Sequence, residues 1–400
     1  GGGGHGPNAG GGGESGIVAR GALGGGRVAL RRAGPPFSAE GGGQISDSGS
    51  LIAGGQTGAV TGVQRAGDDQ VLVVDFPGEL AVGDSVVARV DAEKRARTQA
   101  NHTGTHLLNW ALRAVVGDGV RQAGSYVGPD KLRFDFTHTE KVPAADLQRI
   151  EDLVLERIRD DDPVAAAEMP RAEAGALGAI GLFEEKYGEV VRVVSAGDYS
   201  RELCGGTHVS STGEIGPFCV ASESSVGAGA RRIEALTGPG VSQWFAEREA
   251  GLRTELDART ARVDALEAEL AAAGGEPPSP PEPATVPPAP PGDVPALRAR
   301  ERALEQEIRA RSARAAELER ALADTRRASA DPAGLAAGAE QSGAARLVVA
   351  EVPAGDMNEL LALTTQVRDL VGDGAAVVLG ARADGKAMVV ANLGEAAVAA

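Results

Sequence analysis

Short apolar runs alternate with turn residues over residues 36–92. The stretches Gln70 to Phe76 and Asp84 to Val90 carry Val and Leu at strand-like spacing, and Gly, Asp and Pro separate them. Such a pattern is typical of short strands joined by tight turns. We therefore expect a small all-β barrel over residues 36–92. Residues 1–35 are rich in Gly and poorly patterned, although Val28 to Leu30 could begin a strand.

The pattern changes to a helical period after residue 92. Residues 93–118 carry apolar side chains three and four positions apart, which predicts one amphipathic helix. A second amphipathic helix is expected over 145–162, a buried strand over 190–194, and two strands joined by a Gly-rich loop over 215–235. We assign residues 93–240 to one α+β domain.

Two later stretches have the apolar seam of a coiled coil. Residues 243–271 and 296–325 each repeat apolar side chains at alternating four- and three-residue spacing, with a single gap in each stretch. Between them, residues 274–295 hold ten of the chain's 22 prolines, so this segment cannot be helical. We predict an antiparallel helical hairpin over residues 241–330, with residues 274–295 as a long Pro-rich tip.

Residues 345–400 differ in pattern again. Strand-like runs over 346–352, 375–379 and 386–391 surround an expected helix over 358–370. This order predicts a small α/β domain, which we expect to be incomplete at its end. The whole chain is thus predicted to be an α+β multidomain protein.

Composition narrows the classes of function. Hydrophobic residues make up 42% of the chain, which is enough for packed cores. The net charge of −16 argues against nucleic-acid binding by bulk charge, although a local basic groove stays open. Two Cys in 400 residues exclude a disulfide framework, and no signal peptide or membrane-spanning apolar run is evident, which favours a cytoplasmic protein without a membrane partner. Because the chain opens on Gly1 rather than Met, we expect a fragment.

Two short motifs concentrate the rare metal-binding side chains. His102 and His106 are one helical turn apart, so their imidazoles share one face of the helix over 93–118. Cys204 and His208 repeat the four-residue offset, and together the four would complete a tetrahedral zinc shell. A lone His on an apolar stripe is usually a core residue, but the matched pairs favour a metal.

The kind of metal site stays open. The helix lacks the Glu that follows the first His in metalloprotease helices, because Thr103 and Gly104 stand there, so a peptidase is not expected. Four protein ligands are typical of a structural zinc site, whereas a catalytic site keeps one position open. Either the zinc only shapes a pocket, or one ligand gives way to substrate. Cys219 lies between apolar residues and is expected to be a buried strand residue.

The barrel contains a Gly-rich stretch, Phe37 to Gln44, which holds Gly41, Gly42 and Gly43. Glycines allow close approach of the backbone to another surface, so this loop could contact an RNA end or close over a site. The alternative is an ordinary barrel turn. A second feature, Arg231 and Arg232, is basic and follows a Gly-rich loop.

Taken together, the motifs resemble the C-terminal half of alanyl-tRNA synthetases, over nearly the whole chain from about residue 28. The residues that carry the resemblance are Phe37 to Gly49, Asn101-His102 and His106-Leu107-Leu108, Gln122 with Gly124-Ser125, Leu132 to Phe136, Leu203 to His208, and Gly229 to Glu234. Several separate motifs in the order of that family make a chance match implausible.

The resemblance implies a function for each part. His102, His106, Cys204 and His208 would hold one zinc ion per chain, and Gln122 would line an editing pocket that hydrolyses tRNA(Ala) mischarged with serine or glycine. The helical hairpin and the last domain would help to bind tRNA(Ala) and to form a homodimer. Nothing in the chain resembles the class II catalytic core that uses ATP and Mg²⁺, so we expect editing hydrolysis and no aminoacylation.

The sequence departs from that family in three places. Ser38 stands where the family usually has Tyr, which puts the packing of the Gly-rich loop in question. The Pro-rich segment is unusual, and the glycine-rich end of the tail domain is absent.

We predict that Thr103, Thr105 and Gln122 recognise the serine hydroxyl. Gly42, Gly43 and Gln44, together with Arg231 and Arg232, are predicted to contact the substrate or the RNA. Two alternatives stay open: a free-standing deacylase of related architecture that edits in trans, and a non-enzymatic RNA-binding module stabilised by zinc.

Overall fold

The computed structural model describes residues 13–24, 27–34, 36–67, 69–181, 188–280, 282, 285–329, 331–383 and 386–398. The chain divides into two compact units. One comprises Gly1–Glu247 with Ala289–Arg298, and the other comprises Arg248–Pro288 with Ala299–Ala400. Every helix within the described ranges is too short or too polar to traverse a lipid bilayer.

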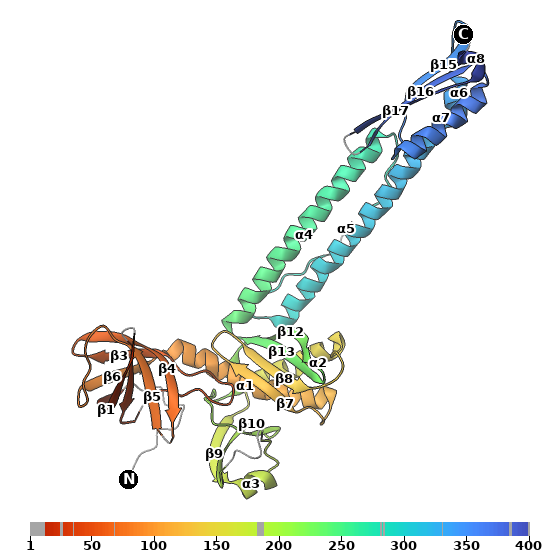
Figure 1. Ribbon diagram of the computed structural model, residues 1–400. Coiled ribbons are helices and arrows are strands. Elements are labelled where there is room, and N and C mark those ends of the chain that lie inside the picture. The colour runs from red at the N-terminus through yellow and green to blue at the C-terminus, as the bar shows by residue number, and fades with distance from the viewer. Residues whose placement is uncertain are drawn as a thin grey trace. The chain divides into compact units, whose positions relative to one another are not determined.

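The first unit begins with a closed six-stranded barrel in the order β1-β2-β5-β4-β3-β6 (Figure 1). The apolar side chains of its interior, among them Leu30, Leu51, Leu72 and Val74, are almost fully buried. The predicted barrel is confirmed. The strands are β1 (Gly13–Gly24), β2 (Arg27–Arg32), β3 (Gly49–Ala53), β4 (Gln56–Ala66), β5 (Asp69–Asp75) and β6 (Ser85–Val90).

The barrel starts earlier than the boundary predicted at residue 36. Strand β2 confirms the expectation that Val28 to Leu30 could begin a strand, whereas β1 was not expected. Residues 1–12 of the segment lie outside the described ranges. Among the described residues of β1, only Ile17 is buried. A strand that buries a single side chain shows no apolar alternation, so its pattern could not reveal it.

The rest of the first unit is the domain that carries the His and Cys motifs. Helix α1 (Ala92–Val116) is capped at its N-terminus by Asp91, whose side chain accepts a hydrogen bond from the backbone N of Lys94. Leu107, Leu108 and Phe134 belong to the core that α1 forms with α2 and a four-stranded sheet. Helix α2 is Ala144–Asp160, and the sheet, in the order β12-β13-β8-β7, comprises Phe218–Gly227, Ala230–Thr237, Leu132–Thr137 and Gln122–Val127.

A second, three-stranded sheet has the order β11-β10-β9. Its strands are β11 (Ser200–Leu203), β10 (Val190–Ala196) and β9 (Val164–Pro170), and α3 (Arg171–Ala176) follows β9. The segment after β11 holds Cys204 and His208 and leads through a short 3-10 turn, η2 (Thr212–Ile215), to β12.

The second unit contains most of two long helices, α4 (Pro239–Ala272) and α5 (Val294–Ser329). Arg300 pairs with Glu249 at 2.8 Å, and Arg326 pairs with Glu269 at 3.5 Å further along both helices. Residue numbers therefore rise in the same direction in both helices, which run parallel (Figure 1). The predicted helix pair and its apolar seam are confirmed, with Val263, Leu266, Leu270, Leu318 and Leu322 buried together.

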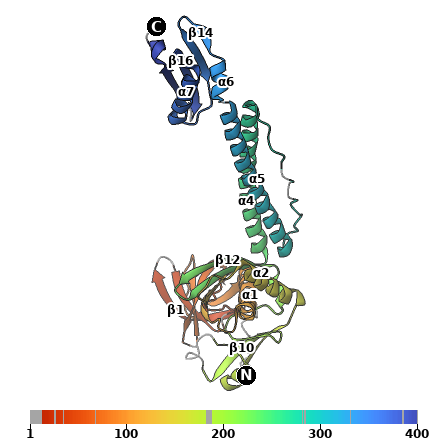
Figure 2. The ribbon, with the colours of Figure 1, turned by 90° about the vertical axis from the view of Figure 1, so that its right-hand side faces the viewer.

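The predicted antiparallel hairpin is wrong. The Pro-rich segment is no tip, because Ser279 O accepts a hydrogen bond from Arg314 and Pro287 O accepts one from Arg300. The segment thus returns beside α5 (Figure 2). Eight residues of extended chain reach about 26–29 Å. The fourteen helical residues between Arg300 and Arg314 rise by about 21 Å, so the return is sterically possible.

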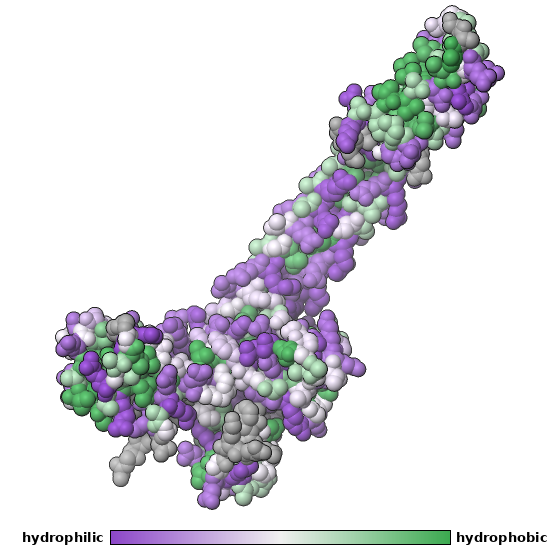
Figure 3. All heavy atoms as spheres, viewed as in Figure 1, coloured by the Kyte–Doolittle hydropathy of each residue, from purple (hydrophilic) through white to green (hydrophobic). Residues whose placement is uncertain are grey.

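The last domain is a four-stranded sheet in the order β14-β15-β16-β17 with helix α7 between the parallel strands β15 and β16. The register places the exposed side chains of Val349, Val389 and Leu393 on one face of this sheet. An apolar surface is visible over this domain in Figure 3. The elements are α6 (Pro332–Ala337), β14 (Glu340–Ser342), β15 (Ala345–Glu351), α7 (Met357–Val371), β16 (Ala375–Ala383), β17 (Lys386–Leu393) and α8 (Glu395–Val398).

Candidate metal centre and substrate cavity

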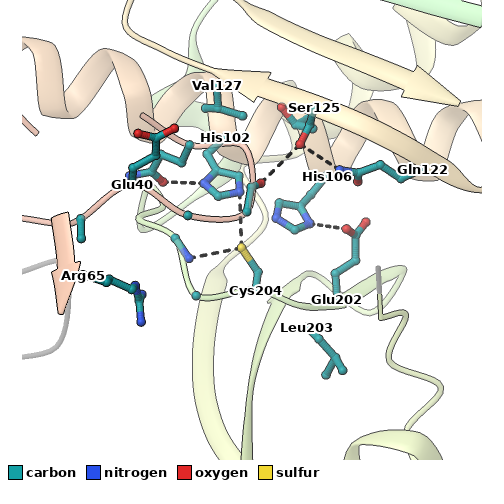
Figure 4. A pocket seen from close by; sticks show the side chains of 17 residues that line it. Glu40, Arg65, His102, His106, Gln122, Ser125, Val127, Glu202, Leu203 and Cys204 are labelled. Carbon is teal, nitrogen blue, oxygen red and sulfur yellow. Dashed lines mark hydrogen bonds and ion pairs between the residues drawn. The ribbon is translucent and has the colours of Figure 1, made fainter. Parts of the chain in front are cut away.

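The structure brings the four predicted ligands together. Helix α1 presents His102 and His106 from adjacent turns, and Cys204 from the segment after β11 lies opposite them (Figure 4). The same segment also brings His208 to the cluster. One ligand atom from each of the four residues lies within 4.8 Å of the others. The Sγ atom of Cys204 is 3.3 Å from Nε2 of both His102 and His208.

These four side chains fit a tetrahedral zinc ion. Ligand bonds of 2.0–2.3 Å in a tetrahedron place ligand atoms about 3.3–3.7 Å apart, close to the sulfur–nitrogen distances found here. The Nε2 atom of His106 is buried, and it has no hydrogen-bond partner among the described residues. A buried polar atom of this kind needs a partner, and a metal would supply it. Three imidazoles and a thiolate are a donor set that zinc prefers.

The other nitrogen of each imidazole already has a partner. Nδ1 of His102 lies 2.7 Å from Oε1 of Gln44. Nδ1 of His106 lies 2.8 Å from Oε2 of Glu202, and Nδ1 of His208 lies 3.1 Å from Oγ1 of Thr103. Partners of this kind fix the orientation and tautomer of metal-binding histidines.

Arg192 stabilises the loop that carries Cys204 and His208. One nitrogen of this guanidinium donates to Cys204 O and Gly206 O, each at 2.8 Å. Gly206 packs directly on the first histidine, since a Cβ added there would lie 2.1 Å from Cε1 of His102. The neighbouring Gly205 has open space at the same position. The second glycine of the motif is therefore required by the close approach to His102.

The surroundings of the cluster shift the pKa values of His106, His208 and Cys204 in different directions. Burial by itself lowers the pKa of His106, but the Glu202 carboxylate outweighs it and raises the pKa to about 10. Burial, together with the charge of His102, lowers the pKa of His208 to about 3. Burial would raise the pKa of the Cys204 thiol, yet the surrounding imidazoles, His102 above all, bring it well below its usual value.

The cluster opens onto a cavity of about 540 Å³ between the barrel and α1 (Figure 4). Its volume lies in the range of small-ligand sites. Glu40 and Arg65 line it from the barrel, and Gln122 and Ser125 line it from β7. Thr105, His102, His106 and Cys204 complete the wall on the cluster side.

Comparisons with known proteins point to one family. The chain is 39% identical over 365 residues to an alanine–tRNA ligase of Geobacillus thermodenitrificans and 41% identical over 359 residues to one of Rubrobacter xylanophilus, and each match covers 89% of this chain. Over this length the chain is a homologue of alanine–tRNA ligases. An alanine–tRNA ligase of Halorhodospira halophila is 48% identical over 233 residues, which are 58% of this chain and 27% of the relative.

The matches to the two longer-aligned ligases cover 37% of each relative, so the chain spans little more than a third of their length. A family model described as the second additional domain of threonyl and alanyl tRNA synthetases matches residues 191–234. This part runs from β10 into β13 and includes Cys204 and His208. The shared segment of these synthetases thus supplies half of the metal cluster.

The three residues predicted to recognise serine lie at different places. Thr105 and Gln122 line the cavity. Thr103 is not among the lining residues; its hydroxyl contacts Nδ1 of His208 and accepts a hydrogen bond from the backbone N of Val209 at 3.3 Å. Thr103 therefore helps to position His208, because its hydroxyl oxygen is already engaged by the cluster.

Of the residues predicted to contact substrate or RNA, some line the cavity and others do not. Gly42 lines the cavity, whereas Gly43 packs against Ser125. Gln44 lines the cavity wall, but it is only 2% exposed and its amide is engaged by His102 and Thr207. Arg231 pairs with Glu223 at 2.5 Å, and Arg232 pairs with Asp135 at 2.7 and 2.8 Å. Both guanidinium groups are therefore engaged in ion pairs within the sheet.

Two residues of the site had no place in the sequence interpretation. Glu202 and Asn109 are buried, and Asn109 donates to Oε1 of Glu202 at 2.9 Å. No local sequence pattern signalled Glu202, because the burial of alternate side chains in β11 (Ser200–Leu203) is seen only in the fold. A buried carboxylate requires a charged or hydrogen-bonding partner, which here is His106 of the candidate metal cluster.

Proposed function

We propose that this chain binds one Zn²⁺ through His102, His106, Cys204 and His208 and hydrolyses tRNA(Ala) mischarged with serine or glycine. One observation carries the proposal: in a homologue of alanine–tRNA ligases, three residues of a four-residue His/Cys cluster line a cavity that is large enough for a small ligand.

An enzyme that selects alanine needs such an activity. Glycine lacks one methyl group, which a binding pocket converts into only about 1–3 kcal/mol of discrimination, and an added hydroxyl is hard to exclude from a small pocket. A second site that cleaves wrong products supplies the missing accuracy.

The reaction is the hydrolysis of an ester. Water adds to the carbonyl carbon of the amino acid, the bond to the ribose oxygen breaks, and the products are the free amino acid and tRNA with its hydroxyl restored. Zinc, when bound by all four side chains, would orient the aminoacyl end, and it would act as a Lewis acid on oxygen once one of these ligands gives way. The described side chains hold the aminoacyl end in the cavity and shield it from bulk water.

Two side chains are placed to recognise the amino acid. The Thr105 hydroxyl donates to Asn101 O at 2.8 Å, so its oxygen lone pairs can accept the proton of a serine hydroxyl. The Gln122 amide nitrogen donates to Ser125 Oγ at 2.9 Å, which fixes this side chain at the cavity wall. Arg65 offers the positive charge on the barrel side of the cavity, where we place a phosphate of the tRNA end.

The partners follow from the same assignment. We propose tRNA(Ala) as the substrate because the relatives are alanine–tRNA ligases. We also propose that the chain forms a homodimer through the last domain, since the exposed apolar face with Val349 and Val389 favours a protein partner. The helix pair would add to the same contact.

The proposal is tested by deacylation of Ser-tRNA(Ala). The Cys204→Ala variant should lose more than about a hundredfold in rate, because loss of a ligand exceeds the 10–100-fold effect of an outer-shell partner. Cys219→Ala is the matched control, since Cys219 is buried in β12 and is not one of the four ligands. Equal rates for wild type and Cys204→Ala would remove this cavity as the editing site, and zinc binding without deacylation would favour an RNA-binding module.

A further inference from the structure

The Gly-rich loop of the barrel is part of the wall of the metal domain. Ile45 N donates to Val127 O at 3.0 Å, and Val127 N donates to Gly43 O at 2.8 Å, so the loop pairs with the end of β7. Gly43 has a φ of 87°, and a Cβ there would lie 2.2 Å from Ser125 Oγ. The loop therefore fits against β7 without space for a side chain at residue 43.

Gln44 then reaches the metal cluster from this loop. The backbone N of Thr207 lies 2.9 Å from one atom of the Gln44 amide, and a backbone N–H can only donate. This atom is therefore the oxygen Oε1. The same oxygen lies 2.7 Å from Nδ1 of His102, so Nδ1 carries the proton and donates it. The lone pair of His102 is consequently on Nε2, the atom that faces Cys204 Sγ.

The loop is also fixed at its far end. Asp47 is buried and accepts a hydrogen bond from Nε of Arg95 at 2.7 Å. Arg95 precedes His102 by seven residues, which are two turns, so both lie on one face of α1. The loop thus lies along this face with Asp47 on Arg95 and Gln44 on His102.

We propose that Gln44 is a positioning residue of the metal centre and that it couples the barrel to metal binding. Gln44 holds His102 in the tautomer and orientation that a metal requires. By reciprocity, metal binding to His102 stabilises the docked loop to the same extent. The inference rests on the metal-binding part of the proposed function and adds a role for the barrel in it.

The test compares Zn²⁺ affinity in a chelator competition. Gln44→Met keeps the approximate volume but removes the strong acceptor, and we expect affinity to fall by about 10–100-fold. Gln64→Met is the matched control, because Gln64 is an exposed residue of β4 in the same barrel. The absorption of bound Co²⁺ reports separately whether the Cys204 thiolate still ligates.

Two further measurements keep the inference falsifiable if Gln44→Met folds poorly. Gln44→Glu keeps an acceptor for His102, so its Zn²⁺ affinity should equal or exceed that of the wild type. In the wild type, Zn²⁺ should slow hydrogen exchange at the amide of Ile45. The inference would be overturned if Gln44→Met bound Zn²⁺ as tightly as the wild type, or if Gln44→Glu bound it tenfold more weakly. It would also be overturned if Zn²⁺ did not change the rate of hydrogen exchange at Ile45. A wild-type chain that binds no Zn²⁺ would overturn the proposed function with it.

Discussion

Nδ1 of His106 lies 2.8 Å from Oε2 of Glu202, and both side chains are buried. The imidazole comes from α1 and the carboxylate from β11, so this pair ties the two metal-binding segments to each other. The two groups form an ion pair at Nδ1, which leaves Nε2 for the other side chains of the cluster. Asn109 holds the second carboxylate oxygen and so prevents its rotation.

Replacing Glu202 by Gln should weaken zinc binding. The amide has the shape of the carboxylate but lacks its charge, and outer-shell substitutions of this kind cost about 10–100-fold in metal affinity. Chelator competition measures the change. Glu189→Gln, at an exposed position next to β10, serves as the control and should bind as the wild type does. An equal effect of both substitutions would contradict a specific role for Glu202.

Zinc binding should release about one proton near pH 7.5. The pKa of His106 is raised to about 10, so this residue must give up a proton to ligate, whereas the pKa values of Cys204 and His208 are lowered and favour their deprotonated forms. If only the His106 proton is considered, the apparent zinc affinity should increase by up to tenfold for each unit that the pH rises, until the pH reaches about 10. Titration calorimetry in buffers of different ionisation enthalpy counts the protons, and a count near zero would refute this proton distribution.

The same raised pKa predicts how the metal-free protein responds to pH. A His whose pKa is raised by folding adds stability that is fully present below its unfolded pKa of about 6.5 and is lost as pH rises through about 10. Denaturant unfolding of the metal-free chain at several pH values should therefore show this loss in the wild type. The loss should be absent in His106→Gln.

The two glycines of the second motif should respond differently to substitution. Gly206→Ala places a Cβ 2.1 Å from His102, and we expect an overpacking cost of about 1–3 kcal/mol with weaker zinc binding. Gly205→Ala meets open space and should be nearly neutral. Thermal unfolding and zinc titration of the two variants compare them directly. A neutral Gly206→Ala would show that this loop can move away from His102.

The sequence could predict that His102, His106, Cys204 and His208 lie together, but not which residues orient them. His102 and His106 share a helix face by their spacing, and Cys204 with His208 forms a compact motif, so local rules suffice. Gln44 and Glu202 reach the histidines from distant segments. Such contacts depend on how the barrel and β11 pack against α1, which no local pattern encodes.

The sequence could not predict whether α4 and α5 run parallel or antiparallel, for a different reason. An apolar seam of four-three spacing is the same in parallel and antiparallel pairs. The Pro-rich segment excluded a helix, yet its length permits either a tip or a return. Arg314 and Arg300 decide between them, because each binds a backbone oxygen of this segment.

Shortening the Pro-rich segment should therefore disrupt the helix pair. Deleting residues 277–288 leaves about nine residues between α4 and α5, which span at most about 32 Å. The 34 residues of α4 rise by about 50 Å, so a parallel partner could no longer return. We expect a lower melting temperature of the helical signal in circular dichroism. An unchanged melt would favour an antiparallel hairpin.

The central claim is most directly tested by the amino acid released from charged tRNA(Ala) by the zinc-loaded chain. We predict one zinc per chain and release of serine at least about tenfold faster than release of alanine, because a site that binds the serine hydroxyl discriminates against its absence. A chain that carries one zinc but releases serine and alanine at the rate of the buffer alone would contradict the account.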